Sequence, residues 1–165
     1  MLQKVHSVAF ILPLLPPYVD LSHLVAVFDA DDMLWPQFAL AAQAASVDPS
    51  KLDNFVVKNS PHYTAEEKTR LFAAFRDTKL FELAEFYPGI EKMSALHELG
   101  IHIRIDSKSF NEDISAVKRR RLKAAMPFLQ DSDLNLTISG QDHADSGKEI
   151  GREVTFFADD NPYNV

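Results

Sequence analysis

The sequence predicts an α/β protein in which a parallel β-sheet carries helices on both faces and a small helical cap is inserted after the first strand. Two observations predict this class. Short apolar runs alternate with amphipathic helical patterns along the chain, as in proteins built from β-α-β units. The interval between the first two apolar runs, roughly 70 residues, is much longer than a crossover connection needs, which indicates an insertion.

Four apolar runs have the length and composition of buried strands. They cover residues 24–28, 101–105, 134–138 and 154–158. Helical patterns separate them. In residues 87–100 apolar side chains recur at helical spacing up to Gly100, a residue type that commonly terminates helices. Residues 112–126 form a second amphipathic pattern, so a helix is expected before and after the second strand.

Residues 35–86 form the predicted cap. Three helical patterns lie there, in residues 36–45, 48–57 and 64–77. The last of them begins with Thr64 and has Glu67 three residues later, the spacing of a capping box. The chain is thus divided into an N-terminal extension (1–23), a core (24–34 and 87–165) and the helical cap (35–86).

Composition restricts the function classes. With 165 residues, 46% of them hydrophobic, the chain can bury one core and a small subdomain. A net charge of −7 argues against a nucleic-acid polymer as partner, because phosphate binding needs a basic surface. The basic segment 118–123 (KRRRLK) is therefore expected to be the solvated outer face of its helix. The absence of cysteine excludes disulfides and thiolate metal sites, and it fits a cytoplasmic location.

The first 23 residues contain an apolar run, 8–15, which Pro13 interrupts. This run is too short to span a bilayer. It has a weak basic start and no small-x-small cleavage site, so a signal peptide is not favoured. We expect an extra segment packed on the core, or a non-native leader, and no association with a membrane.

Three carboxylates, Asp29, Asp31 and Asp32, follow the first predicted strand within four positions. One of them could simply cap a helix, where aspartate is favoured. Three would repel one another and raise each other's pKa unless a cation or a set of hydrogen-bond donors compensated them. The cluster therefore indicates a metal site.

Polar residues also follow two other predicted strands. The sequence DSKS, residues 106–109, follows the second strand, and DDNPYN, residues 159–164, follows the fourth. Ligands of an open parallel sheet bind at the carboxyl ends of its strands, so the two acidic clusters are expected to meet at one edge. Mg²⁺ suits such a site, because a few carboxylates, a carbonyl and waters hold it.

Four segments resemble, in order, the signature motifs of the haloacid dehalogenase (HAD) superfamily of Mg²⁺-dependent phosphotransferases. They are VFDADDMLW, IRIDSKSF, a following Lys148, and FFADDNPYN. The resemblance covers residues 24–165 and implies a Rossmann-like sheet. Within the superfamily, the helical insert, the segment YPGIEKMSALHELG and the DDNPYN ending are similar to the 5'(3')-deoxyribonucleotidase group. Asp32 stands where glycine is common in the superfamily, and Met33 where threonine or valine is usual.

The resemblance implies the catalytic roles. Asp29 would be the nucleophile that forms an aspartyl-phosphate, and Asp31 would protonate the leaving alcohol and then activate water. Its backbone carbonyl would also face the metal. The implied Mg²⁺ ligands, with the residue that would orient them given last, are Asp29, Asp31, Asp160, Asp159 and Asn164.

Two further residues would hold the phosphoryl oxygens in the implied site. The first is Ser107, for which Ser109 is the rival because the choice depends on where the strand ends. The second is Lys148, which competes with other lysines of the chain, namely Lys108 and Lys123.

The function predicted from these residues is a Mg²⁺-dependent phosphomonoesterase acting on a small phosphorylated metabolite. A nucleoside monophosphate is one candidate, because aromatic residues of the cap region could stack on a base, although most are expected to be cap core instead. These residues are Trp35, Phe38, Phe55, Tyr63, Phe72 and Phe75. The alternatives are a phosphatase for a sugar or another small metabolite, and a catalytically weak module that binds Mg²⁺ and an anion.

Overall fold

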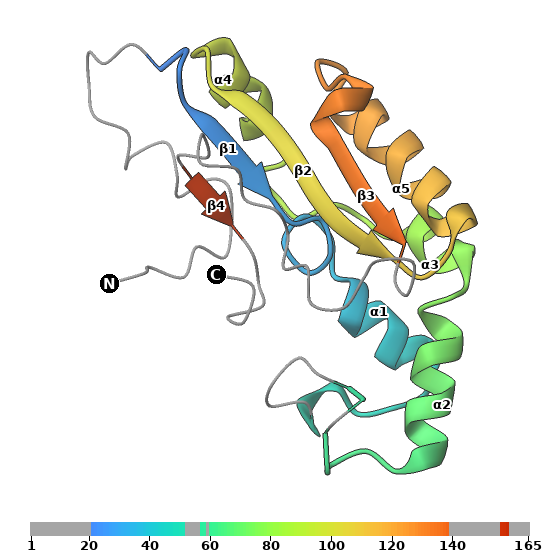
Figure 1. Cartoon of the computed structure of the whole chain (residues 1–165). Helices are drawn as coiled ribbons and strands as arrows, with labels where there is room; N and C mark the ends of the chain where they lie inside the picture. The colour runs from blue at the N-terminus through green and yellow to red at the C-terminus, as the bar shows by residue number, and fades with distance from the viewer. Residues whose placement is uncertain (1–20, 52–56, 59, 139–155, 159–165) are drawn as a thin grey trace.

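The computed structural model of the chain describes residues 21–51, 57, 58, 60–138 and 156–158. Its strands form one parallel sheet in the order β3-β2-β1-β4 (Figure 1). The bounds are β1 Val25–Phe28, β2 His102–Ser109, β3 Leu134–Ile138 and β4 Phe156–Ala158. The predicted α/β class with a parallel sheet is therefore confirmed. Residues 1–20 of the predicted N-terminal extension lie outside the described residues.

Strand β2 ends four residues later than the sequence predicts. Its apolar run ends at Ile105, but the strand continues to Ser109. The extra length comes from pairing, because Ile105 to Ser109 lie opposite Leu134 to Ile138 of β3. Residues 106–109 are therefore the last residues of the strand, and not a loop that follows it.

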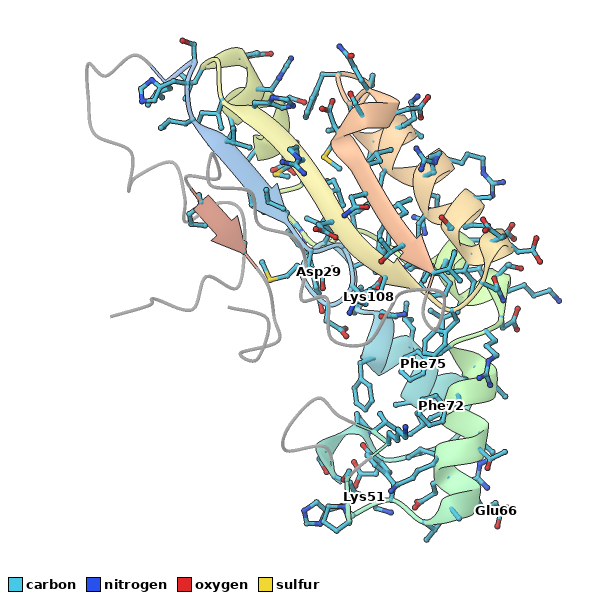
Figure 2. All side chains as sticks on the ribbon, in the orientation of Figure 1. Asp29, Lys51, Glu66, Phe72, Phe75 and Lys108 are labelled. Carbon is cyan, nitrogen blue, oxygen red and sulfur yellow. The ribbon has the colours of Figure 1, made fainter. Side chains whose placement is uncertain are left out.

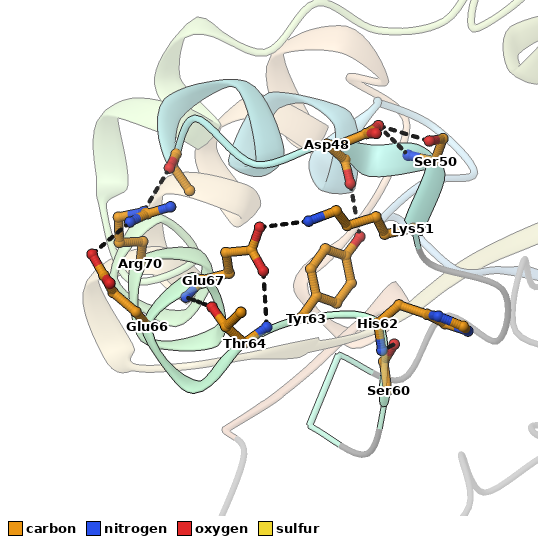
Figure 3. Close-up of polar contacts among 11 residues, drawn as sticks. Asp48, Ser50, Lys51, Ser60, His62, Tyr63, Thr64, Glu66, Glu67 and Arg70 are labelled. Carbon is orange, nitrogen blue, oxygen red and sulfur yellow. Dashed lines mark hydrogen bonds and ion pairs between the residues drawn. The ribbon is translucent and has the colours of Figure 1, made fainter.

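Five α-helices are described: α1 Gln37–Ala44, α2 Ala65–Ala74, α3 Thr78–Leu83, α4 Lys92–Glu98 and α5 Glu112–Ala125. Short 3-10 turns cover Pro49–Lys51 and Asp131–Asp133. The capping box predicted at Thr64 is confirmed, since its hydroxyl accepts from the Glu67 N–H and the Glu67 carboxylate accepts from the Thr64 N–H (Figure 3). Among the helices of the described segments, none is long and apolar enough to cross a membrane.

The main core lies between the sheet and helices α4 and α5. Alternate residues of the strands, such as Phe28 and Ile105, belong to the same buried cluster as Leu96 of α4 and Leu122 of α5. Side chains of a strand alternate between the two faces, so these helices cover the same face of the sheet. The connection from β3 to β4 runs through residues 139–155, outside the described segments, so a helix on the opposite face stays a prediction.

The insertion between β1 and α4 has a core of its own. Helices α1 and α2 extend beyond the carboxyl ends of the strands (Figure 1). They share a second buried cluster, which consists of Ala41, Ala42, Ala45, Val47, Val57, Tyr63, Leu71 and Phe75. Polar contacts close its outer end, where Lys51 pairs with Glu67 at 2.7 Å and the Tyr63 hydroxyl donates to the Asp48 carbonyl at 3.2 Å (Figure 3).

The two ends of the insertion pack differently from its middle. Trp35 and Phe81 belong to the main core and not to the cluster shared by α1 and α2. Between the two clusters, Phe75 of the insertion stacks on Phe110, which follows β2, with ring centroids 5.6 Å apart. Aromatic contacts therefore hold the insertion against the carboxyl end of the sheet.

One prediction for helix α5 is wrong. The basic segment 118–123 is not uniformly a solvated face, because the Lys118 side chain is fully buried. Lys118 lies four residues after Ile114 and four before Leu122, and both of those residues are in the core. Helical geometry thus directs this lysine toward the sheet, where polar partners compensate its charge. The neighbouring Arg119 and Arg120 keep exposed side chains, as predicted.

Candidate active site at the carboxyl end of the sheet

Asp29 follows β1 directly and lies at the carboxyl end of the parallel sheet (Figure 2). Its backbone N–H donates to the Ala158 carbonyl at 2.8 Å, and its carboxylate Oδ1 accepts from the Ala30 N–H at 2.8 Å. The chain leaves β1 toward β2 on one side and comes back to β4 on the other. Strand order reverses at this point, which is where open parallel sheets bind their ligands.

The loop after Asp29 is a tight turn that brings Asp31 and Asp32 to the same edge. The Leu34 N–H donates to the Ala30 carbonyl, and the Asp32 N–H donates to the Trp35 carbonyl. Asp32 has a φ of 56°, in the left-handed region that favours glycine. This backbone conformation explains why glycine suits the position, and aspartate is among the residues that tolerate it.

The Asp31 carboxylate is held at both oxygens. Its Oδ1 accepts from the indole Nε1 of Trp35 at 2.9 Å. Its Oδ2 lies 2.5 Å from Lys118 Nζ and accepts from the Ser107 hydroxyl at 3.3 Å. The partners come from the turn, from β2 and from α5, so three separate elements position one carboxylate.

Ser107 reaches this cluster, whereas its rival Ser109 does not. Ser107 is fully buried near the end of β2 and accepts a hydrogen bond from Lys118 Nζ at 3.2 Å. The Ser109 hydroxyl is also buried, but it has no hydrogen-bond partner within the described part of the chain. Of the two serines, Ser107 is the one placed beside Asp31.

Burial raises the pKa of Asp32 from 3.8 to about 7. The Phe38 N–H, which donates to its carboxylate at 2.9 Å, opposes this shift, and the nearby charges of Asp31 and Asp29 reinforce it. The charges of Asp31 and Asp29 therefore contribute to the raised pKa of Asp32, for which burial is the largest cause. Lys118 lowers the pKa of Asp32 less than these effects raise it.

We expect the Asp32→Asn protein to be more stable than the wild type at pH 8, by about 1 to 3 kcal/mol. Between pH 3.8 and about 7 the folded wild type keeps a proton that the unfolded chain has lost, so its stability falls as pH rises through this window. Asparagine does not titrate, tolerates a positive φ and can accept from the Phe38 N–H. Urea unfolding of both proteins at pH 4, 6 and 8, with chelator present, measures the difference.

The two stabilities should converge toward pH 4. A difference that stays constant from pH 4 to pH 8 would contradict the raised pKa of Asp32.

The structure brings together three of the predicted site residues: Asp29, Asp31 and Ser107. The other four, Lys148, Asp159, Asp160 and Asn164, lie outside the described residues. Asp159 comes next in the chain after Ala158, whose carbonyl accepts from Asp29. Of the two other lysines that could compete with Lys148, Lys123 pairs with Asp131 at 3.2 Å, and Lys108 contributes its carbonyl to the cluster by accepting from Lys118.

The donors at this edge fit a hard divalent cation. Asp29 provides a carboxylate and Asp31 a backbone carbonyl, both oxygen ligands of the kind that Mg²⁺ prefers, and the charges of the two aspartates raise the pKa of Asp32 beside them. One carboxylate and one carbonyl leave most of the coordination positions of Mg²⁺ to water, substrate or further protein ligands. Within the described segments, no group of three or more His, Asp or Glu side chains is placed to hold a metal ion. Further protein ligands would come from residues 159–160.

Two residues of the cluster were not assigned to it from the sequence. The sequence suggests Trp35 as an aromatic residue of the cap, but its side chain is 1% exposed and donates its indole N–H to Asp31. For Lys118 the basic segment predicts a solvated position. The sequence feature that could have identified Lys118 is its spacing, since Ile114, Lys118 and Leu122 lie on one helical face.

Comparison of the chain with protein-family models, with curated proteins and with solved structures finds no match. The function is therefore inferred from the motifs of the sequence and from the geometry at the carboxyl end of the sheet.

Proposed function

We propose that the protein is a Mg²⁺-dependent phosphomonoesterase of the HAD type that acts through an aspartyl-phosphate. The observation that carries the proposal is the placement of two carboxylates after β1. Asp29 lies at the point where strand order reverses, and two positions later Asp31 is held by Lys118, Ser107 and Trp35. A nucleophile beside a rigidly held acid/base group is the arrangement that two-step phosphoryl transfer needs.

Asp29 is the proposed nucleophile. Its carboxylate oxygen attacks phosphorus, an O–P bond to Asp29 forms, and the bond from phosphorus to the leaving oxygen breaks. Mg²⁺ would be held by Asp29, Asp160, Asp159 and the backbone carbonyl of Asp31, with Asn164 as their support, and would supply the positive charge that lets an anionic nucleophile approach a phosphate dianion. The fit of the described part of this site to a hard cation supports that assignment.

Asp31 is the proposed acid and base. In the first step it gives a proton to the leaving oxygen, which departs as an alcohol. In the second step it takes a proton from water while the water oxygen bonds to phosphorus and the bond to Asp29 breaks, which releases inorganic phosphate and restores both carboxyl groups. Its partial exposure, 17% of the side chain, is consistent with contact with a substrate.

Ser107 and Lys148 are proposed to bind the phosphoryl oxygens as their charge shifts in the transition state. The Ser107 hydroxyl donates to Asp31 in the present structure, so it would have to rotate toward a bound phosphoryl group.

The finer architecture is also proposed: a Rossmann-like core with helices on both faces and the insertion as its cap. The strand order β3-β2-β1-β4 and the position of α1 and α2 beyond the strand ends support it (Figure 1). The absence of cysteine supports a cytoplasmic location.

The proposed substrate is a small phosphorylated metabolite, and nucleoside monophosphates are the first class to test. Three of the aromatic residues considered for stacking, Trp35, Tyr63 and Phe75, are buried in the protein cores. Among the described residues this leaves the partly buried Phe38 and Phe72 as stacking surfaces, and Phe55 lies outside the described residues. A base stacked on an aromatic ring gains roughly 1 to 3 kcal/mol. Phosphatases for sugars and other small metabolites would use the same chemistry.

We expect the purified protein to release phosphate from members of a panel of nucleoside monophosphates, sugar phosphates and aryl phosphates when Mg²⁺ is present, and to lose that activity with EDTA. The rank order of substrates distinguishes a nucleotidase from a sugar phosphatase. No phosphate release from any compound, with saturable Mg²⁺ binding retained, would favour the catalytically weak binding module instead.

A further inference from the structure

Lys118 lies in the middle of α5 and is one of the largest fully buried side chains of the described residues. A buried ammonium is costly unless polar partners surround it. A lysine is not needed here to fill the core, because an apolar side chain of similar length would pack between Ile114 and Leu122 without the cost of burying a charge. The presence of a charge there therefore points to a role in the cluster at the strand ends.

Every N–H of the Lys118 ammonium is engaged. An ammonium has three donors. Nζ lies 2.5 Å from Asp31 Oδ2, 2.6 Å from the Lys108 carbonyl and 3.2 Å from the Ser107 hydroxyl oxygen. The ring of Phe81 covers it from a further side, with Nζ 5.1 Å from the centroid. A saturated, covered ammonium has no donor left for a phosphoryl oxygen, so its partner in the site is Asp31.

We propose that Lys118 is a positioning residue that fixes the Asp31 carboxyl group for proton transfer to and from the substrate. Lys118 holds Oδ2 and the indole of Trp35 holds Oδ1, so the carboxylate is held from two sides by buried groups. Proton transfer to a leaving oxygen needs the acid within hydrogen-bond reach and correctly aligned, and a group that rotates freely meets this condition rarely. The kinetic part of this inference rests on the proposed function.

Kinetics on two classes of substrate test this role. An alkyl phosphate has a poor leaving group that needs protonation, whereas an aryl phosphate such as p-nitrophenyl phosphate needs little. We expect Lys118→Met to lower kcat on an alkyl phosphate by about 10- to 100-fold and on the aryl phosphate by less than about threefold. Equal losses on both substrates would overturn the proposal, because they would place Lys118 on the phosphoryl group or in the fold alone.

A double-mutant comparison covers the case in which Lys118→Met alone fails to fold. The Asp31→Asn, Lys118→Met protein lacks both members of the ion pair, so no unpaired charge is left in the cluster. If Lys118 acts through Asp31, the double variant and Asp31→Asn should show the same ratio of alkyl to aryl turnover. A further change of that ratio in the double variant would count against the proposal. Lys123→Met, on the same helix and paired with Asp131, is the matched control.

A measurement that needs no catalysis separates this inference from the proposed function. Trp35 is the single tryptophan of the chain, so its indole N–H gives one assignable NMR signal that reports on Asp31. Lys118→Met should shift this signal upfield and speed its exchange with solvent, as Asp31→Ala should, and Lys123→Met should leave it in place. If the wild type hydrolyses no phosphomonoester, the proposed function fails; if the indole signal of folded Lys118→Met is also unchanged, the positioning of Asp31 by Lys118 fails independently.

Discussion

Asp29→Asn is expected to lower turnover of every phosphomonoester substrate by about three orders of magnitude or more. Asparagine keeps the shape of aspartate and can still accept the hydrogen bond from the Ala30 N–H. It is neutral, and its amide oxygen is a poor nucleophile, so no acyl-phosphate bond to phosphorus should form. Initial rates at saturating substrate and Mg²⁺ measure the effect.

The matched control for this variant is Asp131→Asn. Asp131 is exposed and pairs with Arg119 and Lys123 on the outer surface of α5, so its substitution should leave turnover within about twofold of the wild type. A fully active Asp29→Asn protein would show that the nucleophile has been assigned wrongly, whatever the activity of the other variants.

Asp160→Ala is expected to weaken Mg²⁺ binding and lower turnover, each by about 10- to 100-fold. The prediction rests on chain connectivity. Strand β4 ends at Ala158, whose carbonyl accepts from the Asp29 N–H. The acidic residues 159 and 160 therefore follow, in the chain, a residue that is hydrogen-bonded to the proposed nucleophile. Titration of Mg²⁺ by calorimetry, together with the Mg²⁺ dependence of the rate, measures both effects.

Two further variants decide how specific this effect is. Asp131→Ala removes a carboxylate of the outer surface and should change neither quantity. Modest and equal losses from Asp160→Ala and Asp131→Ala would mean that the two acidic clusters do not form one site. If Asp159→Ala strongly weakens Mg²⁺ binding and Asp160→Ala does not, the metal ligand is Asp159 and not Asp160, and the proposed site itself is retained.

Local patterns account for the part of the site that the sequence predicts. Asp29 and Asp31 follow an apolar run that can only be a buried strand or a helix, and the repulsion expected among three carboxylates marks them as a site. The charges of Asp31 and Asp29 add to the raised pKa of Asp32, as that reasoning expects, although burial is its largest cause. Ser107 comes instead from the resemblance to the HAD motifs, which implies a phosphate-binding residue shortly after the second apolar run.

Lys118 and Trp35 could not be assigned from local patterns. A lysine in a basic segment is usually solvated, and that expectation outweighs a spacing of four residues between apolar neighbours. The partner that makes its burial possible, Asp31, is 87 residues away in the sequence. Only the packing of α5 against the sheet brings the two together. The added length of β2 has a similar origin, because it depends on pairing with β3.

The central claim is that Asp29 is phosphorylated during turnover. The most direct test is to quench the protein in acid during the reaction with Mg²⁺ and a phosphomonoester, digest it, and locate the added phosphate by mass spectrometry. We expect an acid-stable, hydroxylamine-labile phosphate on Asp29 in the peptide that contains VFDADDMLW, present in the wild type and absent from Asp29→Asn. Active protein that releases phosphate while Asp29 stays unmodified, or that carries the phosphate on another residue, would contradict it.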